Sequence, residues 1–164
     1  MNLQQCWTTY LQAEKLLEQG HWPQAHYLFE DVLHHLPHHI QHATHDENTK
    51  PCQMSCLIAG LRDAAVYQSE ILNNMGQYQR AFEVLNQSYA LLQFMSIEES
   101  DLVAAVSPVL EKNSNDLLRH IGAFCLAQRN ASWQLEYEQV EKAHHYFTQL
   151  KSYRELQSGA PVFN

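Results

Sequence analysis

The sequence has 164 residues, of which 45% are hydrophobic, and its 18 acidic and 10 basic residues give a formal net charge of −8. This acidic balance argues against a general nucleic-acid binder, because contacts to phosphates need a basic surface. No segment approaches the roughly 18 consecutive apolar residues of a membrane span, and the N-terminus lacks the basic and apolar regions of a secretion signal. Four cysteines in this length do not indicate a disulfide scaffold. We therefore expect a cytoplasmic protein with one domain over residues 1–158, followed by a short tail at 159–164.

The first two predicted helices form a hairpin. Apolar residues at helical spacing predict a helix over residues 3–19, and a second apolar series predicts its partner over 23–36. Gly20 lies where the end of a helix needs a residue that tolerates positive φ. Pro23 falls in the first turn of the next helix, where its missing N–H costs nothing. Pro37 is expected to close the second helix.

Small, aromatic and proline residues recur through this hairpin in a fixed order. Ala13 and Ala25 are small enough to let the two backbones approach, and the rings of Trp22 and Phe29 are expected to fill the space around them. The full set is Ala13, Gly20, Trp22, Ala25, Phe29, Val32 and Pro37. This set resembles the signature of the tetratricopeptide repeat (TPR), a helix–turn–helix unit of about 34 residues. The resemblance implies an all-α fold, in which antiparallel helical hairpins stack as a right-handed array of about six or seven helices.

A second copy of the turn begins at Gly76, 56 residues after the first. A tandem repeat would place it about 34 residues on, so roughly 22 residues are inserted between the two units. We expect repeat 1 at about 6–39, the insertion at about 40–61, and repeat 2 at about 62–95. The counterparts of Ala13, Ala25, Trp22 and Phe29 in the second copy are Ser69, Ala81, Tyr78 and Leu85.

The insertion is rich in histidine, and we expect residues 38–50 to form a loop before a helix that starts near Pro51. It contains five residues of the kinds that Zn²⁺ prefers, with four-residue spacings that can place two ligands on one helix face. These residues are His38, His42, His45, Cys52 and Cys56. A metal-binding or metal-responsive protein is therefore one functional hypothesis, with Zn²⁺ as the possible cofactor. The alternative is a solvated loop without metal, with Cys56 as a core residue of the following helix.

The C-terminal part is expected to contain a degenerate pair of helices over about 115–156. Before this pair, a helical segment is expected from about Leu102 to near Asn113, and Pro108 should kink or split it. Gly122 and Ala143 stand where small residues would allow close contact between the two helices. The turn between them lacks the Gly–x–aromatic pattern, so a true third repeat stays a hypothesis.

Glu141 and His144 form an E–x–x–H element like that of di-iron four-helix proteins. Such a site needs two of these elements and two further glutamates. The nearest mate is Asp31 with His34, which has the wrong acid and lies at a helix end, so a solvated face is the simpler interpretation. No nucleotide-binding glycine loop, serine elbow or HExxH motif occurs. We therefore expect that the protein is not an enzyme. A helical-bundle enzyme is the third hypothesis, ranked below the two others.

In the resembling family, the first helix of each unit lines a concave groove that binds peptides or partner helices. Carried over by position, this resemblance implies a groove formed by Trp7, Tyr10, Glu14, Leu17 and Glu18 from the first unit, and by Asp63, Val66, Glu70, Asn73 and Asn74 from the second. This surface is acidic with apolar anchors, and it lacks the Lys and Arg of the family's carboxylate clamp. It therefore favours a basic or amphipathic partner by charge complementarity.

The leading functional hypothesis is a non-catalytic protein–protein interaction module, possibly a homodimer, that binds neither nucleic acid nor membrane. The glutamine- and histidine-rich composition resembles that of some bacterial proteins. The alternative for the groove is that Trp7 and Tyr10 pack against the insertion or against another subunit, because short arrays have end surfaces that need covering.

Overall fold

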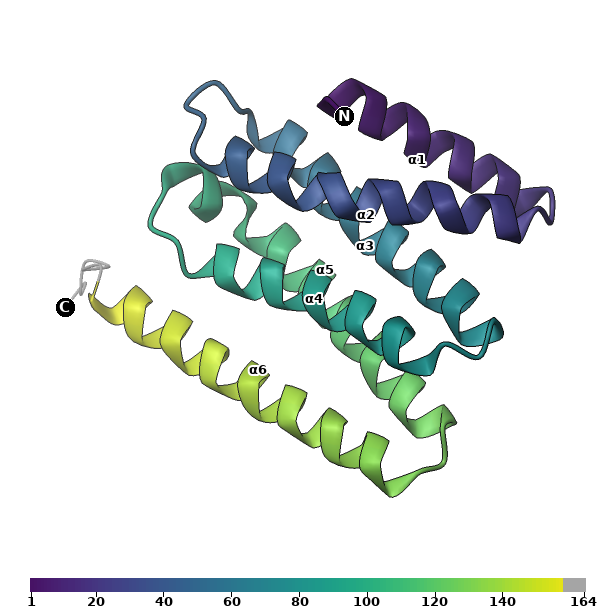
Figure 1. The fold of residues 1–164 in the computed structure, drawn as a ribbon. Coiled ribbons are helices and arrows are strands. Elements are labelled where there is room, and N and C mark those ends of the chain that lie inside the picture. The colour runs from purple at the N-terminus through teal and green to yellow at the C-terminus, as the bar shows by residue number, and fades with distance from the viewer. Residues whose placement is uncertain (158–164) are drawn as a thin grey trace.

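A computed structural model describes residues 1–157 and contains six α-helices joined by short connections (Figure 1). In chain order these are α1 (Leu3–Glu18), α2 (Trp22–Thr44), α3 (Pro51–Asn74), α4 (Tyr78–Ser96), α5 (Asp101–Ala127) and α6 (Ala131–Gln157). The expected all-α array is confirmed, with six helices and no strand over the described residues. None of these helices carries an apolar stretch long enough to cross a lipid bilayer.

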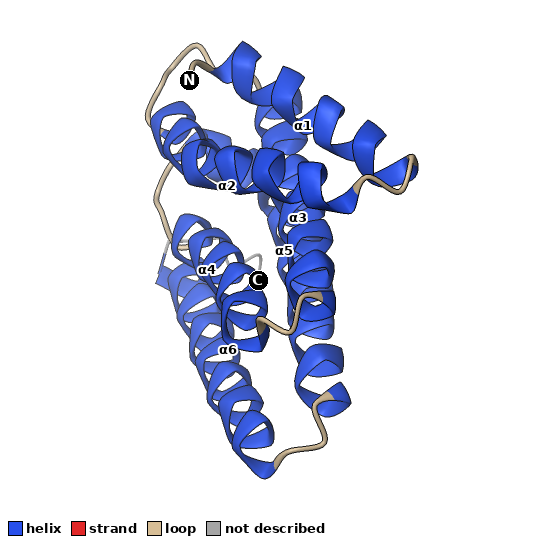
Figure 2. Cartoon of the chain, turned by 45° about the vertical axis from the view of Figure 1, so that its right-hand side comes forward, coloured by secondary structure: helices blue, strands red, loops and turns tan. Residues whose placement is uncertain are grey.

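Each helix packs against the next one along the chain, so the array consists of successive antiparallel hairpins. Figure 2 shows α2, α4 and α6 along one side of the array and α3 and α5 along the other, with α1 above them. α3 contacts α2, α4 and α5 and carries eleven buried residues, whereas α6 buries only Val140 among its described residues. The hydrophobic core is therefore centred on α3. α6 contributes the fewest buried residues to it.

Two glycines reverse the chain at equivalent places. Gly20 ends α1 with φ +81° and Gly76 ends α3 with φ +77°, as their positions in the sequence predict. The amide that follows each glycine donates to the carbonyl five residues back, over 2.8 Å in the first turn and 2.9 Å in the second. This hydrogen bond satisfies a carbonyl at the helix end, and the left-handed residue turns the chain back for an antiparallel partner.

Arg129 takes the same conformation at the end of α5, with φ +51°, although it is not a glycine. It lies 53 residues after Gly76, and its amide donates to the carbonyl of Leu126 over 3.2 Å. The third hairpin therefore uses the same kind of reversal. This turn is not predicted from the sequence, because its left-handed position is occupied by arginine instead of glycine.

The small residues predicted to lie between the helices of the first two hairpins are buried there. The aromatic residue next to each turn, in contrast, is not buried between the helices. Ala13 and Ala25 are fully buried beside Phe29. Trp22 and Tyr78, by contrast, are each 47% exposed. The prediction that Trp22 fills the space between the helices is therefore wrong. It is the first residue of α2 and lies beyond the end of α1, where no neighbouring helix covers it.

The expected helix end at Pro37 is wrong, and so is the predicted loop over residues 38–44, because α2 continues through Pro37 to Thr44. Leu36, Ile40 and Ala43 follow at helical spacing and are all buried. Their burial stabilises the helical conformation past the proline, which removes one hydrogen-bond donor from the helix. The connection between α2 and α3 is reduced to residues 45–50.

α5 likewise runs unbroken through Pro108, so the expected break near Asn113 is wrong. Pro108 faces solvent, while Val106 and Leu110 on either side of it are buried. Asn113 is itself inside the helix, and its side-chain amide donates to the carbonyl of Val109 over 2.7 Å. Burial of one continuous face thus keeps the helix in one piece.

The C-terminal pair forms a hairpin, but with different contacts from those predicted. Gly122 does mark a close approach, since a Cβ there would lie 2.9 Å from the ring of Tyr137. Ala143 is exposed and makes no such contact, so its prediction is wrong. The face of α6 that packs on the core carries Trp133, Tyr137 and Val140 instead. The bulk of Tyr137 explains why a glycine lies opposite it.

A polar network fixes the second half of α6 to α4. The hydroxyl of Tyr89 lies 2.6 Å from Nδ1 of His144, and Nε2 of Gln93 lies 3.3 Å from the same atom. The ammonium of Lys151 donates to Oε1 of Gln93 over 3.1 Å. Because Nε2 of Gln93 can only donate, Nδ1 of His144 must accept, and the imidazole is neutral in this arrangement. Burial and the positive charge of Lys151 lower the pKa of His144, partly offset by Glu111 on α5.

Arg129→Gly is expected to raise the free energy of unfolding by about 0.5–1 kcal/mol, because a left-handed residue with a Cβ is strained and glycine relieves this strain at some entropic cost. Urea unfolding followed by circular dichroism measures the change. The matched control is Gly20→Ala, which imposes the same strain on the first turn and should lower stability by about 1 kcal/mol. Equal stability of the arginine and glycine chains would contradict the role given to this turn.

The network around His144 should make the fold sensitive to acid. Since the folded-state pKa of His144 lies below its ordinary value of 6.5, the unfolded chain binds more protons below that pH. The contribution of His144 is therefore complete above about pH 6.5 and is lost as the pH falls through the lowered pKa. His144→Asn keeps an acceptor near Nδ1 but cannot titrate, so its stability should fall less than that of the wild type between pH 7 and pH 5, as measured by urea unfolding.

The matched control for this experiment is His120→Asn, which removes an exposed histidine from α5. It should retain the wild-type loss of stability in acid. A His144→Asn chain that loses as much stability as the wild type would show that His144 does not govern the acid response.

Candidate partner-binding face

The side chains of α1 and α3 meet along a line that we call the α1–α3 seam. The ring of Trp7 lies against the backbone of α3, where a Cβ on Gly60 would be 3.0 Å from it. Three residues further along both helices, the charge of Asp63 acts on the hydroxyl of Tyr10. Both pairs are 53 positions apart in the sequence, which indicates that α1 and α3 run in the same direction here. This register brings the predicted residues of the two units onto one surface.

Four carboxylates of the seam gather around Tyr67. Burial raises the pKa of this tyrosine, and the negative charges of Glu14, Asp63, Glu70 and Glu18 raise it further. The ring of Tyr67 packs against the core, with its centroid 5.5 Å from that of Phe29. Because two of the carboxylates come from α1 and two from α3, their common effect on one hydroxyl shows that both helices contribute to one acidic surface. We call these four residues the carboxylate cluster.

The charges of this cluster are only partly compensated. Asp63 accepts from Arg62 over 2.7 Å, and the same guanidinium donates to Asp116 on α5 over 2.8 Å. These hydrogen bonds raise the pKa of Arg62 although its partial burial lowers it. Over residues 1–157, no ion pair with a basic side chain involves Glu14, Glu18 or Glu70. Three carboxylates on the seam thus remain available to a positively charged partner.

Tyr10 belongs to the core rather than to the open surface. It is 5% exposed, stacks on Trp7 with ring centroids 5.2 Å apart, and packs edge-on against Phe29 at 6.2 Å. Its hydroxyl donates to Oε2 of Glu14 over 3.1 Å, and burial is the main cause of its raised pKa. The prediction that Tyr10 contacts a partner is therefore wrong, because Tyr10 lies on the inward face of α1 and is buried in the core. Its visible role is to position Trp7 and Glu14.

The remaining predicted groove residues differ in what they can offer. Leu17 and Val66 are half-buried and pack against the core, whereas Asn74 is exposed. The side-chain oxygen of Asn73 lies 3.5 Å from Nε2 of Gln128 at the end of α5. Asn73 therefore connects α3 with α5 in addition to lying at the end of the seam.

At the other end of the seam lies a cleft of about 680 Å³, which we call the Trp7 cleft. Its lining comes from α1, from the extended end of α2 and from the first turns of α3. Prominent lining residues are Leu3, Trp7, His42, Ala43, Cys52 and Leu57. Trp7 is 40% exposed here, so its ring is available as an apolar wall. The sequence does not predict this cleft, because Pro37 indicates a loop where α2 in fact continues.

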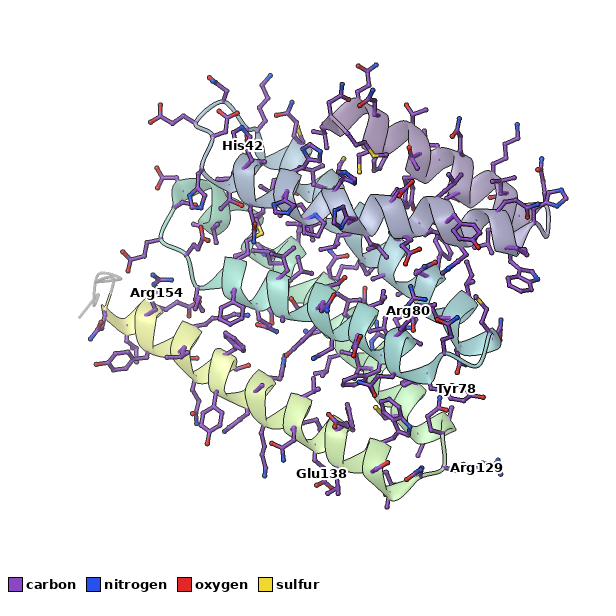
Figure 3. All side chains as sticks on the ribbon, in the orientation of Figure 1. His42, Tyr78, Arg80, Arg129, Glu138 and Arg154 are labelled. Carbon is purple, nitrogen blue, oxygen red and sulfur yellow. The ribbon has the colours of Figure 1, made fainter. Side chains whose placement is uncertain are left out.

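The five predicted zinc ligands do not form one set. His42, Cys52 and Cys56 line the Trp7 cleft, whereas Nε2 of His45 lies 3.8 Å from a carboxylate oxygen of Glu98. Figure 3 shows His42 near the connection between α2 and α3. Over the described part of the chain, no group of three or more His, Cys, Asp or Glu side chains is placed to hold a metal ion. His38 lies four residues before His42 on α2 but does not line the cleft.

Two further expectations about these side chains are corrected by the structure. Cys56 is exposed, so it is not the core residue that its apolar neighbours predicted. Glu141 is exposed, as the expectation of a solvated face predicts, but His144 is half-buried and faces Tyr89, so that expectation is wrong for His144. Tyr67, the centre of the carboxylate cluster, was not predicted. Its sequence signal is the pair of acids four positions before it and three positions after it on the same helix face.

Comparisons with protein-family models, curated proteins and solved structures return no match to this chain.

The carboxylate cluster predicts a measurable shift in tyrosine ionisation. The titration of Tyr67, obtained as the difference in ultraviolet absorbance between wild type and Tyr67→Phe, should lie above the ordinary tyrosine pKa of about 10. Glu14→Gln/Glu70→Gln removes two of the nearby negative charges and should lower that pKa. Gln for Glu at position 83 on α4, away from the seam, is the control. A pKa unchanged by the double substitution would show that these carboxylates do not surround Tyr67.

Proposed function

We propose that this chain is a non-catalytic interaction module of the TPR type, and that it binds a basic amphipathic segment of another protein along the α1–α3 seam. The observation that carries this proposal is the chemical difference between the two ends of the seam. One end has three carboxylates without a basic partner in the described structure, and the other opens into the apolar Trp7 cleft. An amphipathic segment has the matching pair of surfaces.

The dimensions of the seam fit a short helical partner. Trp7 and Glu18 are 11 residues apart on α1, which corresponds to about 16 Å along a helix. A partner helix of about three turns covers this length. Lysine or arginine side chains at one end of it would pair with the carboxylate cluster, and apolar side chains at the other end would enter the cleft beside Trp7.

Several features favour binding over catalysis. The perturbed groups on the seam are tyrosines with raised pKa values, which makes them poor proton donors and acceptors near neutral pH. Neither the metal-binding alternative nor the helical-bundle enzyme gains support from the placement of its residues. We place this module in the cytoplasm, in keeping with four cysteines that are all free.

A synthetic helix of about 20 residues, with a leucine stripe and a lysine stripe, is a suitable probe for isothermal titration calorimetry. The wild-type chain should bind it, and Glu14→Lys/Glu70→Lys should weaken binding about tenfold or more, because each reversal replaces attraction by repulsion. The matched control is Glu83→Lys/Glu136→Lys, which changes the net charge equally at exposed positions on α4 and α6, away from the seam. This control should leave the affinity within about twofold.

The two ends of the seam can also be separated in this assay. Trp7→Ala should lower the affinity without changing its dependence on salt, because it removes apolar contact only. Equal losses in the seam and control reversals would indicate non-specific attraction to an acidic protein and would overturn the proposal. So would binding of the same helix with glutamate in place of lysine.

A further inference from the structure

One side of α2 carries a histidine on each of three successive turns. His34, His38 and His42 are all exposed, and each lies four residues from the next. Residues four apart fall on one face of a helix, so the three side chains follow a single ridge. Leu36 and Ile40 are buried on the opposite side of the helix, which turns the ridge toward solvent. We call these three residues the histidine ridge.

The continuation of α2 through Pro37 keeps these side chains close to one another. Cβ atoms four residues apart on a helix are separated by about 5–6 Å, so two imidazole rings can converge on one ion. Metal–nitrogen bonds to histidine are only about 2.0–2.1 Å long, and they need such proximity. A chain that left the helix at Pro37 would separate His34 from His38. The ridge therefore depends on the packing that extends α2.

A neighbouring pair of histidines on α2 has the same spacing but is already engaged. Nδ1 of His35 lies 2.9 Å from the carbonyl oxygen of Asp31, and Nε2 of His39 lies 3.0 Å from the carbonyl oxygen of Met1. Both rings are half-buried. Over residues 1–157, by contrast, no hydrogen bond or ion pair engages a ring of the histidine ridge. Its ring nitrogens are open to a ligand.

We propose that the histidine ridge binds one divalent late transition-metal ion through two imidazoles at a time, with His38 in either pair. His34 and His42 are eight residues apart, about 12 Å along the helix axis, so a single ion cannot bind both. This geometry agrees with the absence of any three-residue metal group over the described chain. The site differs from the five-residue zinc set that the sequence predicts. It uses no cysteine, and it does not use His45, whose ring faces Glu98.

The imidazole nitrogens determine the class of ion. Zn²⁺, Ni²⁺ and Cu²⁺ bind imidazole well, whereas Mg²⁺ and Ca²⁺ prefer oxygen ligands. No second group orients the rings of the ridge, and such outer partners typically contribute about 10–100-fold to metal affinity. We therefore expect a dissociation constant in the micromolar range, with water in the remaining coordination positions.

Isothermal titration calorimetry of the untagged full chain with Ni²⁺ tests the proposal. The wild type should bind Ni²⁺, with no comparable binding of Mg²⁺. His38→Ala removes both pairs and should raise the dissociation constant about tenfold or more, because single histidines lose the advantage of linked ligands. The matched control is His39→Ala, one position further along the same helix. It should leave the dissociation constant within about twofold, and circular dichroism should show both variants folded.

The sharing of His38 between two pairs has its own test. Since either neighbour completes a pair, His34→Ala and His42→Ala should each raise the dissociation constant only about twofold, as expected for the loss of one of two similar sites. The double variant should bind as weakly as His38→Ala. Cys52→Ser/Cys56→Ser should bind as the wild type does.

Urea unfolding in the presence of Ni²⁺ separates a pair held by the helix from binding to single histidines. An ion that binds the folded pair better than the unfolded chain stabilises the fold. Ni²⁺ should therefore raise the urea midpoint of the wild type more than that of His38→Ala.

Three results would overturn the proposal. The first is a dissociation constant weaker than about 1 mM for the wild type. The second is an equal loss of affinity in His38→Ala and His39→Ala, and the third is loss of binding in the cysteine variant. None of these measurements involves the peptide probe, so failure here is distinct from failure of the seam proposal.

Discussion

The arrangement of this molecule depends on the reversal of the chain after every second helix. At Gly20, Gly76 and Arg129 the backbone enters the left-handed region, and the following helix returns antiparallel to the one before. Because the connections are only a few residues long, each hairpin must pack against itself before it packs against the next. α1 and α3 are thereby brought to one side of α2 in the same direction, and this shared direction is the origin of the α1–α3 seam.

Helix length is the second determinant, and here burial outweighs a local penalty. Proline inside a helix costs about 3 kcal/mol, whereas complete burial of a side chain such as Leu36 or Ile40 contributes about 1.5–3 kcal/mol each. Continuation of α2 past Pro37 therefore stabilises the fold. It also carries His42 and Ala43 to the N-terminal end of α1, where they complete the Trp7 cleft.

The two ends of the array differ in their chemistry. At the first end, Tyr10 and Tyr67 lie beneath a cluster of carboxylates, and the guanidinium of Arg62 is shared between Asp63 and Asp116. At the other end, α6 is attached through a polar network around His144 and turns large apolar side chains outward.

The presence of the helices, the two glycine turns and the acidic character of the seam can be predicted from the sequence. These follow from local causes: apolar spacing, the freedom of glycine at positive φ, and the position of Glu14 and Glu70 on their helices. Tertiary packing determines that α2 and α5 continue through their prolines and that Trp22 and Cys56 face solvent. It also determines that the five predicted zinc ligands do not form one set. Each of these outcomes depends on which face a neighbouring helix covers, and that contact joins residues far apart in the chain.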